Sequence, residues 1–120
     1  MYSPQVLEHF QNPRNVGDLP APAATVETQN PVCGDVLRLA VRMEAGSAVE
    51  VRFRARGCVA AIACASCLTE MMQGKTLAEL AALRREDLID SVGGLPPASQ
   101  HGAALALDAL HQLLRLLQND

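Results

Sequence analysis

Two neighbouring segments with strict alternation constrain the fold of this chain more than any other feature. Residues 37–43 and 49–56 place apolar side chains at odd positions and arginine, glutamate or alanine at even positions. The short stretch EAGS lies between them, so the pattern predicts an antiparallel hairpin with one buried and one exposed face. The side chains expected on the buried face are Leu37, Leu39, Val41, Met43, Val49, Val51, Phe53 and Ala55.

The segments before and after this hairpin predict one further strand and several helices. Residues 4–10 can form a short helix capped by Ser3, and residues 24–30 can form a weak first strand. The proline-rich residues 11–23 between them indicate an ordered loop or extended arm. Residues 59–68 are apolar on nearly every side, a pattern that only a buried helix tolerates.

The last third of the chain is expected to be helical. Gly74 can end the buried helix, and TLAE, beginning at Thr76, is typical of a capping box. A further short helix is expected in REDLIDSV, and a final one from about Ser99 to Leu117. Its expected core stripe is Ala103, Leu107, Leu110, Leu114 and Leu117, opposite Asp108, His111, Gln112 and Arg115. The prediction is a single α+β domain, residues 1–120: a small three-stranded antiparallel sheet with helices packed on one face.

Composition excludes some classes of function. The net charge of −3, the absence of Trp and the single Tyr argue against a dedicated nucleic-acid binder. No segment approaches the roughly 20 apolar residues of a membrane span, and the first residues carry no leader pattern. We therefore expect a cytoplasmic location, without a membrane partner, and four cysteines that serve as thiols or ligands.

The hairpin brings two of these cysteines to one end of the sheet. Cys33 precedes its first strand and Cys58 follows its second, and either of two registers places them within one residue of facing each other. Asp35 lies at the same end, between glycines 34 and 57 that permit a tight bend. Two thiols and a carboxylate can hold zinc or iron, but small buried cysteines would give the same spacing.

Five stretches occur in a characteristic order: HFQNPRNVGDL, PVCGD, RGCVAAIACASCLTEM, GKTLAEL and LPPASQH. Together they closely resemble the U-type iron–sulfur cluster assembly scaffolds, the IscU-like and NifU N-terminal family. The resemblance implies that family's fold, a small antiparallel sheet with helices on one side, over essentially the whole chain. It also implies a scaffold and not an enzyme.

The resemblance implies a function and a set of ligands. Scaffolds of this family receive sulfur from a cysteine desulfurase, combine it with iron, and hold a labile [2Fe–2S] cluster or sometimes zinc before passing the cluster to accepting proteins. Carried over residue by residue, Cys33, Asp35, Cys58 and His101 match the family's ligands. Asp35 matches the aspartate thought to keep the cluster labile.

The chain departs from the family in the last helix. Gly102 follows His101 where the family has a cysteine that ligates the cluster and accepts sulfur, and a glycine can do neither. Cys64 and Cys67 are candidate substitute thiols, or simply core residues. Cys64 lies six residues beyond Cys58, about 9 Å along a helix axis, which is far for one ion.

A second departure concerns a chaperone contact. The family's LPPVK segment, offered by some members to an Hsp70-type chaperone, is LPPAS here and lacks the lysine. Leu95, Pro96 and Pro97 remain, but a Pro-Pro break before a helix needs no partner. A chaperone partner is therefore doubtful for this chain.

Three interpretations remain open at this stage. The chain is a scaffold for a transient cluster; or a zinc-binding, sulfur-relay or regulatory relative that builds nothing; or a metal-free interaction module. The retained Cys33, Asp35, Cys58 and His101 argue against the third, and the otherwise nearly complete pattern favours the first.

Other polar residues have simpler explanations. His9 and His111 are expected to be solvated helix residues. Asn12-Pro13-Arg14 can belong to a partner surface or only pin the arm. The strand arginines are either a solvated sheet face or a surface for an acidic partner; they are Arg38, Arg42, Arg52, Arg54 and Arg56.

Overall fold

The computed structural model describes residues 1–30 and 34–118, and a three-stranded antiparallel sheet forms one of its layers. Strand β1 spans Ala24–Gln29, β2 spans Val36–Glu44 and β3 spans Ser47–Arg56. The order across the sheet is β1-β2-β3, with β2 in the middle. The predicted hairpin is therefore confirmed as β2 and β3.

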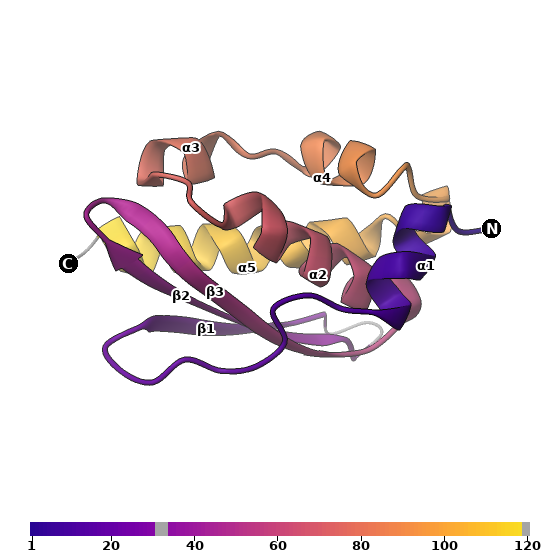
Figure 1. Cartoon of the computed structure of the whole chain (residues 1–120). Helices are drawn as coiled ribbons and strands as arrows, with labels where there is room; N and C mark the ends of the chain where they lie inside the picture. Colours follow the sequence, from indigo (N-terminus) through magenta and orange to yellow (C-terminus); the bar gives the residue numbers. More distant parts are fainter. Residues whose placement is uncertain (31–33, 119–120) are drawn as a thin grey trace.

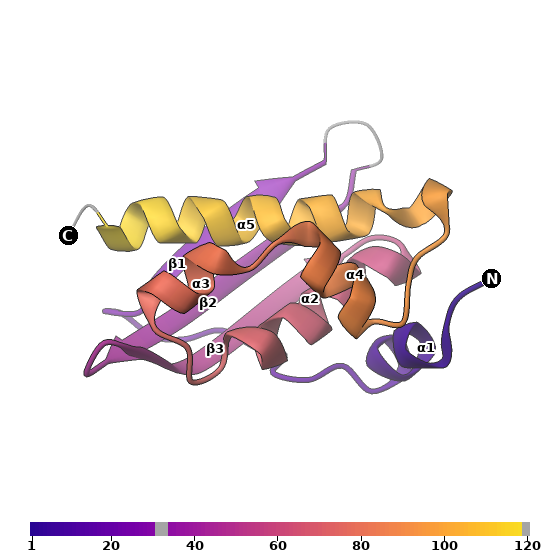
Figure 2. The same ribbon diagram turned by 90° about the horizontal axis from the view of Figure 1, so that it is seen from above.

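Helices cover one face of this sheet, as Figures 1 and 2 show. Helices α2 and α5 lie directly on the strands, and α3 and α4 form an outer layer over them (Figure 1). Helix α1 packs beside α2. The bounds are Pro4–Gln11 for α1, Val59–Met72 for α2, Leu77–Ala82 for α3, Arg85–Ser91 for α4 and His101–Gln118 for α5. The α+β fold class expected from the sequence is confirmed.

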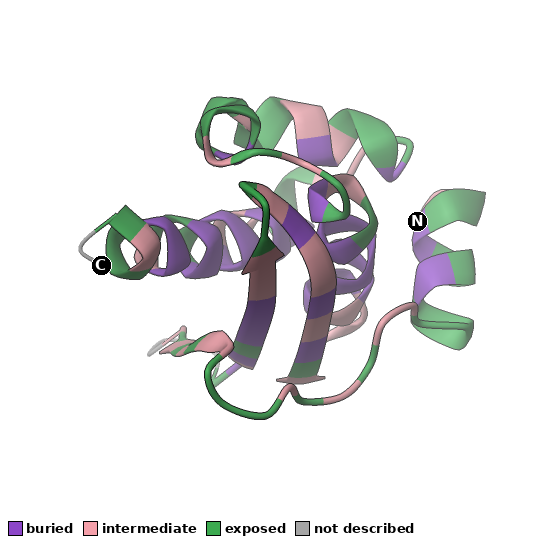
Figure 3. Ribbon diagram, turned by 60° about the vertical axis from the view of Figure 1, so that its left-hand side comes forward, coloured by how far each residue is buried: buried purple, intermediate pink, exposed green. Residues whose placement is uncertain are grey.

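The core lies between the sheet and the α2–α5 pair. The inward side chains Leu39, Val41 and Val51 are at most 1% exposed, and Leu68 of α2 and Leu110 of α5 are fully buried against them. Helix α2 is buried on most of its surface, whereas α3 and α4 are mostly exposed (Figure 3). The nearly all-apolar sequence of α2 is explained by this position between the sheet and the outer helices.

A register shift near the turn changes the expected burial pattern. Val36 pairs with Arg56, but beyond Arg42 the ladder shifts by one residue, so that Met43 pairs with Ala48. Ala48 is fully buried and Val49 only half-buried, so the prediction that Val49 faces the core was wrong. A β-bulge inverts the inside and outside positions on one strand, which uniform alternation cannot anticipate.

The N-terminal arm runs along the free edge of β3. The N–H of Gly17 donates to the carbonyl of Phe53 (2.9 Å), and the N–H of Phe53 donates to the carbonyl of Asn15 (2.9 Å). These bonds satisfy groups that a free strand edge would leave unpaired. The expectation of an ordered, extended arm is confirmed.

Local capping signals were predicted well. The Thr76 hydroxyl accepts from the N–H of Glu79, whose carboxylate accepts from the N–H of Thr76, as a capping box requires. Gly74 adopts a φ of +80° just after α2. The final helix begins at His101 and not at Ser99, because a single 3-10 turn, Pro97–Ser99, precedes it.

Helix α5 buries a wider stripe than predicted. Leu105, Ala106 and Leu113 are buried in addition to most of the predicted stripe, because α5 touches the sheet, α2 and the outer helices together. Gln112 is half-buried and donates to Thr28 Oγ1 at 3.1 Å. Among the described residues, none of the helices combines the length and the apolar character needed to cross a bilayer.

Candidate metal centre

Three elements bring ligand-bearing side chains together at one end of the hairpin. Asp35 precedes β2 directly, Cys58 is the N-cap residue of α2, and His101 is the first residue of α5. Because Val36 and Arg56 form the last pair of the ladder, the residues just outside that pair meet. The fold therefore places at one point three residues that are far apart in the sequence.

The three ligand atoms lie close to one another. Cys58 Sγ is 3.4 Å from Asp35 Oδ2 and 3.3 Å from His101 Nε2, and the last two atoms are 3.6 Å apart. Tetrahedral coordination with metal–ligand lengths of about 2.0–2.3 Å separates neighbouring ligands by about 3.3–3.8 Å. The observed separations match three corners of such a tetrahedron.

The imidazole of His101 is oriented with Nε2 toward the group. Its Nδ1 lies 3.1 Å from the carbonyl oxygen of Ala98. A carbonyl only accepts, so Nδ1 carries a proton, and the neutral ring would then present the lone pair of Nε2 to an ion. Histidines that ligate metals are held in this way by a carbonyl or carboxylate on the other nitrogen.

The carboxylate of Asp35 is held beneath the loop that follows β3. Its side chain is 6% exposed, and Oδ1 accepts from the backbone N–H of Cys58 at 3.3 Å. Gly57, with φ of +154°, makes this approach possible, since a Cβ there would lie 2.4 Å from Asp35 Oδ1. The positive φ of Gly57 agrees with the tight bend predicted there, and the missing Cβ leaves the space that the Asp35 carboxylate fills.

The thiol of Cys58 is neutral in this environment. Burial raises its pKa, opposed by the backbone N–H of Ala61, which donates to Sγ at 3.4 Å, while the hydrogen bond to Asp35 raises the pKa further. A metal ion would displace the thiol proton, because thiolate is the ligand form of cysteine. Thiolate, imidazole and carboxylate together suit zinc or iron.

Comparison with known proteins identifies the family of this chain. A protein-family model described as "NifU-like N terminal domain" matches residues 1–117. The chain belongs to this family. The predicted resemblance is thereby confirmed.

Relatives of this NifU-like domain carry names of the same kind. "Iron-sulfur cluster assembly scaffold protein IscU 1" of Archaeoglobus fulgidus is 40% identical over 114 residues, 95% of this chain and 74% of that protein. "Bifunctional protein NifU/MnmA" of Rubrobacter xylanophilus is 44% identical over 113 residues, 92% of this chain and 23% of that protein. The chain thus spans about a quarter of the bifunctional relative.

Solved structures support the fold. The N-terminal region of a NifU-like protein from Brucella abortus superposes with a TM-score of 0.77 at 19% identity, covering 98% of this chain and 94% of that one. At this identity the likeness concerns the fold alone. The NifU-like architecture is the one that brings Asp35, Cys58 and His101 together here.

Gly102 follows His101 directly, and the absence of a side chain at this position lets α5 pack closely against α2. A Cβ at this position would lie 2.8 Å from the carbonyl carbon of Ala60, 2.9 Å from its oxygen and 2.9 Å from the nitrogen of Ala61. These are backbone atoms in the first turn of α2. The start of α5 therefore lies directly against α2, next to the His101–Cys58 contact.

The other three cysteines do not belong to the three-residue group that the structure describes. Cys33 lies outside the described residues. Cys64 and Cys67 are 0% and 4% exposed, and neither belongs to the three-residue group. Burial raises the pKa of Cys64 to about 12 and that of Cys67 to about 11, so both are protonated thiols at neutral pH. These observations agree with their interpretation as core residues.

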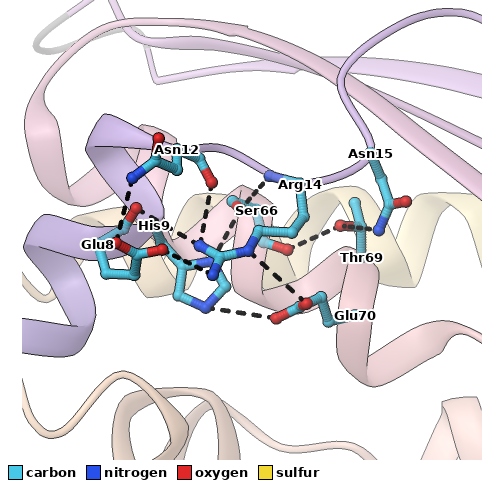
Figure 4. A network of polar contacts seen from close by, with 8 residues as sticks. All are labelled: Glu8, His9, Asn12, Arg14, Asn15, Ser66, Thr69 and Glu70. Carbon is cyan, nitrogen blue, oxygen red and sulfur yellow. Dashed lines mark hydrogen bonds and ion pairs between the residues drawn. The ribbon is translucent and has the colours of Figure 1, made fainter.

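His9 is not solvated, contrary to the prediction. It is 9% exposed, its Nδ1 lies 2.8 Å from Ser66 Oγ, and its Nε2 lies 3.4 Å from Glu70 (Figure 4). The prediction failed because His9 faces α2, and a short helix shows its buried side only once its partner is known. His111 is exposed, as expected.

The NPR stretch of the arm is fixed by the same network. The backbone N–H of Arg14 donates to Ser66 Oγ at 2.8 Å, and its guanidinium pairs with Glu8 at 2.8 Å (Figure 4). Asn15 donates to Thr69 Oγ1 at 3.1 Å. These contacts support the pinning role of Arg14, and sequence reasoning missed Ser66 because a serine in an apolar helix carries no signal of its partner.

Proposed function

We propose that this NifU-like domain is an iron–sulfur cluster assembly scaffold that holds iron or a labile [2Fe–2S] cluster as its cargo. The proposed ligands are Cys33, Asp35, Cys58 and His101. The convergence of the last three at separations of 3.3–3.6 Å is the observation that carries the proposal. The names of the IscU relatives support it.

The chemistry of the donor set suits a scaffold that must release its cargo. Thiolate ligands hold iron–sulfur clusters firmly, whereas a carboxylate is a harder donor and imidazole is intermediate. A cluster bound by Asp35 and His101 together with two thiolates is therefore bound less firmly than a cluster with four thiolate ligands. An iron in a [2Fe–2S] cluster takes only two protein ligands, so one of the three converging groups turns to the second iron.

Sulfur is proposed to come from a cysteine desulfurase, and accepting proteins are proposed to take the finished cluster. Gly102 carries no thiol, and Cys64 and Cys67 are buried whereas Cys58 is partly exposed, so none of the first three serves as a sulfur acceptor in this conformation. The sulfur is therefore received at Cys33 or Cys58 before the cluster closes. Transfer by an Hsp70-type chaperone is not part of the proposal, because the LPPAS segment lacks the lysine.

The geometry of the three ligand atoms also favours a second function, the binding of a single zinc ion. Three ligand atoms at tetrahedral separations, with the start of α5 packed tightly through Gly102, suit one zinc ion as well as one iron. In this alternative the domain holds zinc and regulates or relays sulfur without building a cluster. Cys33 would complete either donor set.

Reconstitution distinguishes these two functions. The protein is purified without air, its metal content is measured, and ferrous iron and sulfide are added. A scaffold develops the visible absorption of a cluster and keeps it through gel filtration. Cys33→Ala, Cys58→Ala and His101→Ala are expected to lose that absorption.

Cys67→Ala is the matched control, because it removes a thiol from the same helix without touching the group. It should develop the same absorption as the unaltered chain. A protein that retains one zinc per chain and gains no visible absorption establishes the zinc function instead. Metal retained in full by Cys58→Ala would overturn both functions.

A further inference from the structure

The face of the sheet opposite the helices carries a hollow lined by arginines. It encloses about 390 Å³ over the three strands, and Arg38, Arg54 and Arg56 supply its positive charges. Glu27 is the one carboxylate in its lining. The hollow is thus a concentration of guanidinium groups on a chain whose net charge is −3.

Two of these arginines face each other across the hairpin. Arg38 of β2 and Arg54 of β3 are direct partners in the ladder. Like charges opposite each other destabilise a sheet unless a counter-charge lies between them. The arm provides it: Asp18 Oδ1 lies 3.2 Å from Arg38 Nη1, and its Oδ2 lies 2.6 Å from Arg54 Nε.

Asp18 shows what chemistry the pair of guanidiniums binds. One carboxylate uses both oxygens to bridge two arginines, and the Arg54 and Arg38 hydrogen bonds hold its pKa below the ordinary value. Its side chain is 47% exposed, so this carboxylate is open to solvent on two arginines that line the hollow. An incoming carboxylate can therefore take its place.

Arg56 has no such partner. Its side chain is exposed, its ladder partner is Val36, and it forms no ion pair with any described residue. Gln29 is the β1 residue in the same row, and it is uncharged. Arg56 thus leaves a positive charge free beside Arg38 and Arg54, which share Asp18, while Arg38 also pairs with Glu27 (Nη2–Oε1 3.4 Å).

The hollow lies at the end of the hairpin that carries the candidate metal centre. Val36 and Arg56 form the last pair of the ladder, and Asp35, Gly57 and Cys58 follow directly. A partner held on the arginines is therefore close in sequence and in space to the loops that carry Asp35 and Cys58. A protein that delivers or accepts cargo at the candidate metal centre could therefore dock on this surface. The docking site itself does not rest on the proposed function.

We propose that this arginine hollow, formed by Arg38, Arg54 and Arg56, docks a carboxylate-rich segment of a partner protein, and that Asp18 pairs with two of these arginines in the free chain. Carboxylate is the group already bound there. A nucleic-acid partner is disfavoured because the chain has a net negative charge and no aromatic stacking platform on this face. The partner replaces the two ion pairs of Asp18 and adds one with Arg56.

The test is an NMR titration of the full chain with a hexaglutamate peptide at low ionic strength. The Nε–H signals of Arg38, Arg54 and Arg56 are expected to shift together. Arg56→Gln should weaken binding about threefold, whereas Arg85→Gln, an equal loss of charge on α4, should leave it nearly unchanged. Asp18→Asn should tighten binding about threefold, because it removes the competing carboxylate.

Asp90→Asn is the control for the last variant, since it removes an exposed carboxylate far from the hollow. Equal effects of Asp18→Asn and Asp90→Asn would overturn the competition. Equal effects of Arg56→Gln and Arg85→Gln, or shifts confined to other surfaces, would overturn the docking site. An oligothymidylate of the same charge that binds more tightly at these arginines would overturn the assignment to a protein partner.

Discussion

Helix α2 contributes to two groupings of polar side chains that contain similar residue types but differ in geometry and exposure. Each combines a nucleophilic side chain, a histidine and a carboxylate. The first consists of Cys58, His101 and Asp35, and the second of Ser66, His9 and Glu70. In the first, three lone-pair-bearing atoms converge at 3.3–3.6 Å, with the His101 side chain 36% exposed.

In the second grouping, the polar atoms of Ser66 are already hydrogen-bonded to neighbouring residues. Ser66 is fully buried, and its hydroxyl oxygen meets His9 and the backbone N–H of Arg14 (Figure 4). Its polar atoms are thus used in holding α1 and the arm against α2. Residue types alone therefore do not define a metal site; the ligand atoms must also converge at a point that an ion can reach.

The largest expected effect is a loss of metal affinity when the first grouping is altered and not when the second is. Cys58→Ala should lower the affinity for Co²⁺ by about 100-fold or more, because it removes one of the two proposed thiolates, the one that touches both Asp35 and His101. Ser66→Ala should change it less than about twofold, because Ser66 touches none of the three ligands. Titration followed by the thiolate-to-cobalt absorption measures both, and similar losses in the two variants would show that the groupings are not distinct.

Gly102→Ala is expected to have the next largest effect. The added Cβ meets the backbone of Ala60 and Ala61, so α5 must shift away from α2 and carry His101 from Cys58. Overpacking of this kind costs about 1–3 kcal/mol, and we expect a roughly tenfold loss of Co²⁺ affinity.

Ala106→Val is the control for this prediction, because it overpacks a fully buried position of the same helix away from the centre. It should destabilise the fold without changing the cobalt spectrum. An unchanged spectrum and affinity in Gly102→Ala would mean that the contact with α2 does not position His101.

In the second grouping, Ser66→Ala should lower the free energy of unfolding by about 1–3 kcal/mol. The substitution removes the shared partner of the Arg14 N–H and of His9 Nδ1, while His9 Nε2 keeps its contact with Glu70. Denaturant unfolding measures the change. Ser91→Ala, at an exposed position of α4, should stay within about 0.5 kcal/mol, and an equally small change in Ser66→Ala would show that the arm is held by other contacts.

The smallest expected effect is a pH dependence of the second grouping. Burial, and then the Arg14 guanidinium, lowers the pKa of His9 in the folded chain below its ordinary 6.5. The unfolded chain therefore binds this proton more readily than the folded chain. The stabilisation from neutral His9 is complete above about pH 6.5 and declines as the pH falls through that value toward the lower folded pKa.

Unfolding at about pH 7.5 and about pH 5.5 measures this dependence in the unaltered chain and in His9→Gln. The variant should lose less stability over that interval than the unaltered chain. Equal losses in the two proteins would assign the pH dependence to other groups.

The sequence predicted regular features because each rests on a local rule. Period-two alternation identified the hairpin, TLAE the capping box, and the position of Asp35 and Cys58 at the strand ends brought them together. The burial of Val49 was mispredicted because a bulge changes the register by one residue. His9 was mispredicted because its burial depends on α2, which is more than 50 positions away in the chain.

Within the candidate site, the resemblance to the family predicted His101 as a ligand, and the structure showed how its ring is oriented. Spacing could not show that His101 Nδ1 donates to Ala98, or that Gly102 presses on Ala60. Both facts depend on how α5 meets α2, which no local pattern encodes. Cys33 remains a prediction.

X-ray absorption at the iron edge of the reconstituted protein tests the central claim most directly. The account predicts a mixed shell in which sulfur from cysteine and sulfide accompanies nitrogen or oxygen from His101 and Asp35, with iron–iron scattering from a cluster. The sulfur and iron–iron contributions should disappear in Cys58→Ala and persist in Cys67→Ala. An iron shell of oxygen and nitrogen alone in the unaltered chain, without sulfur or a second iron, would contradict the account.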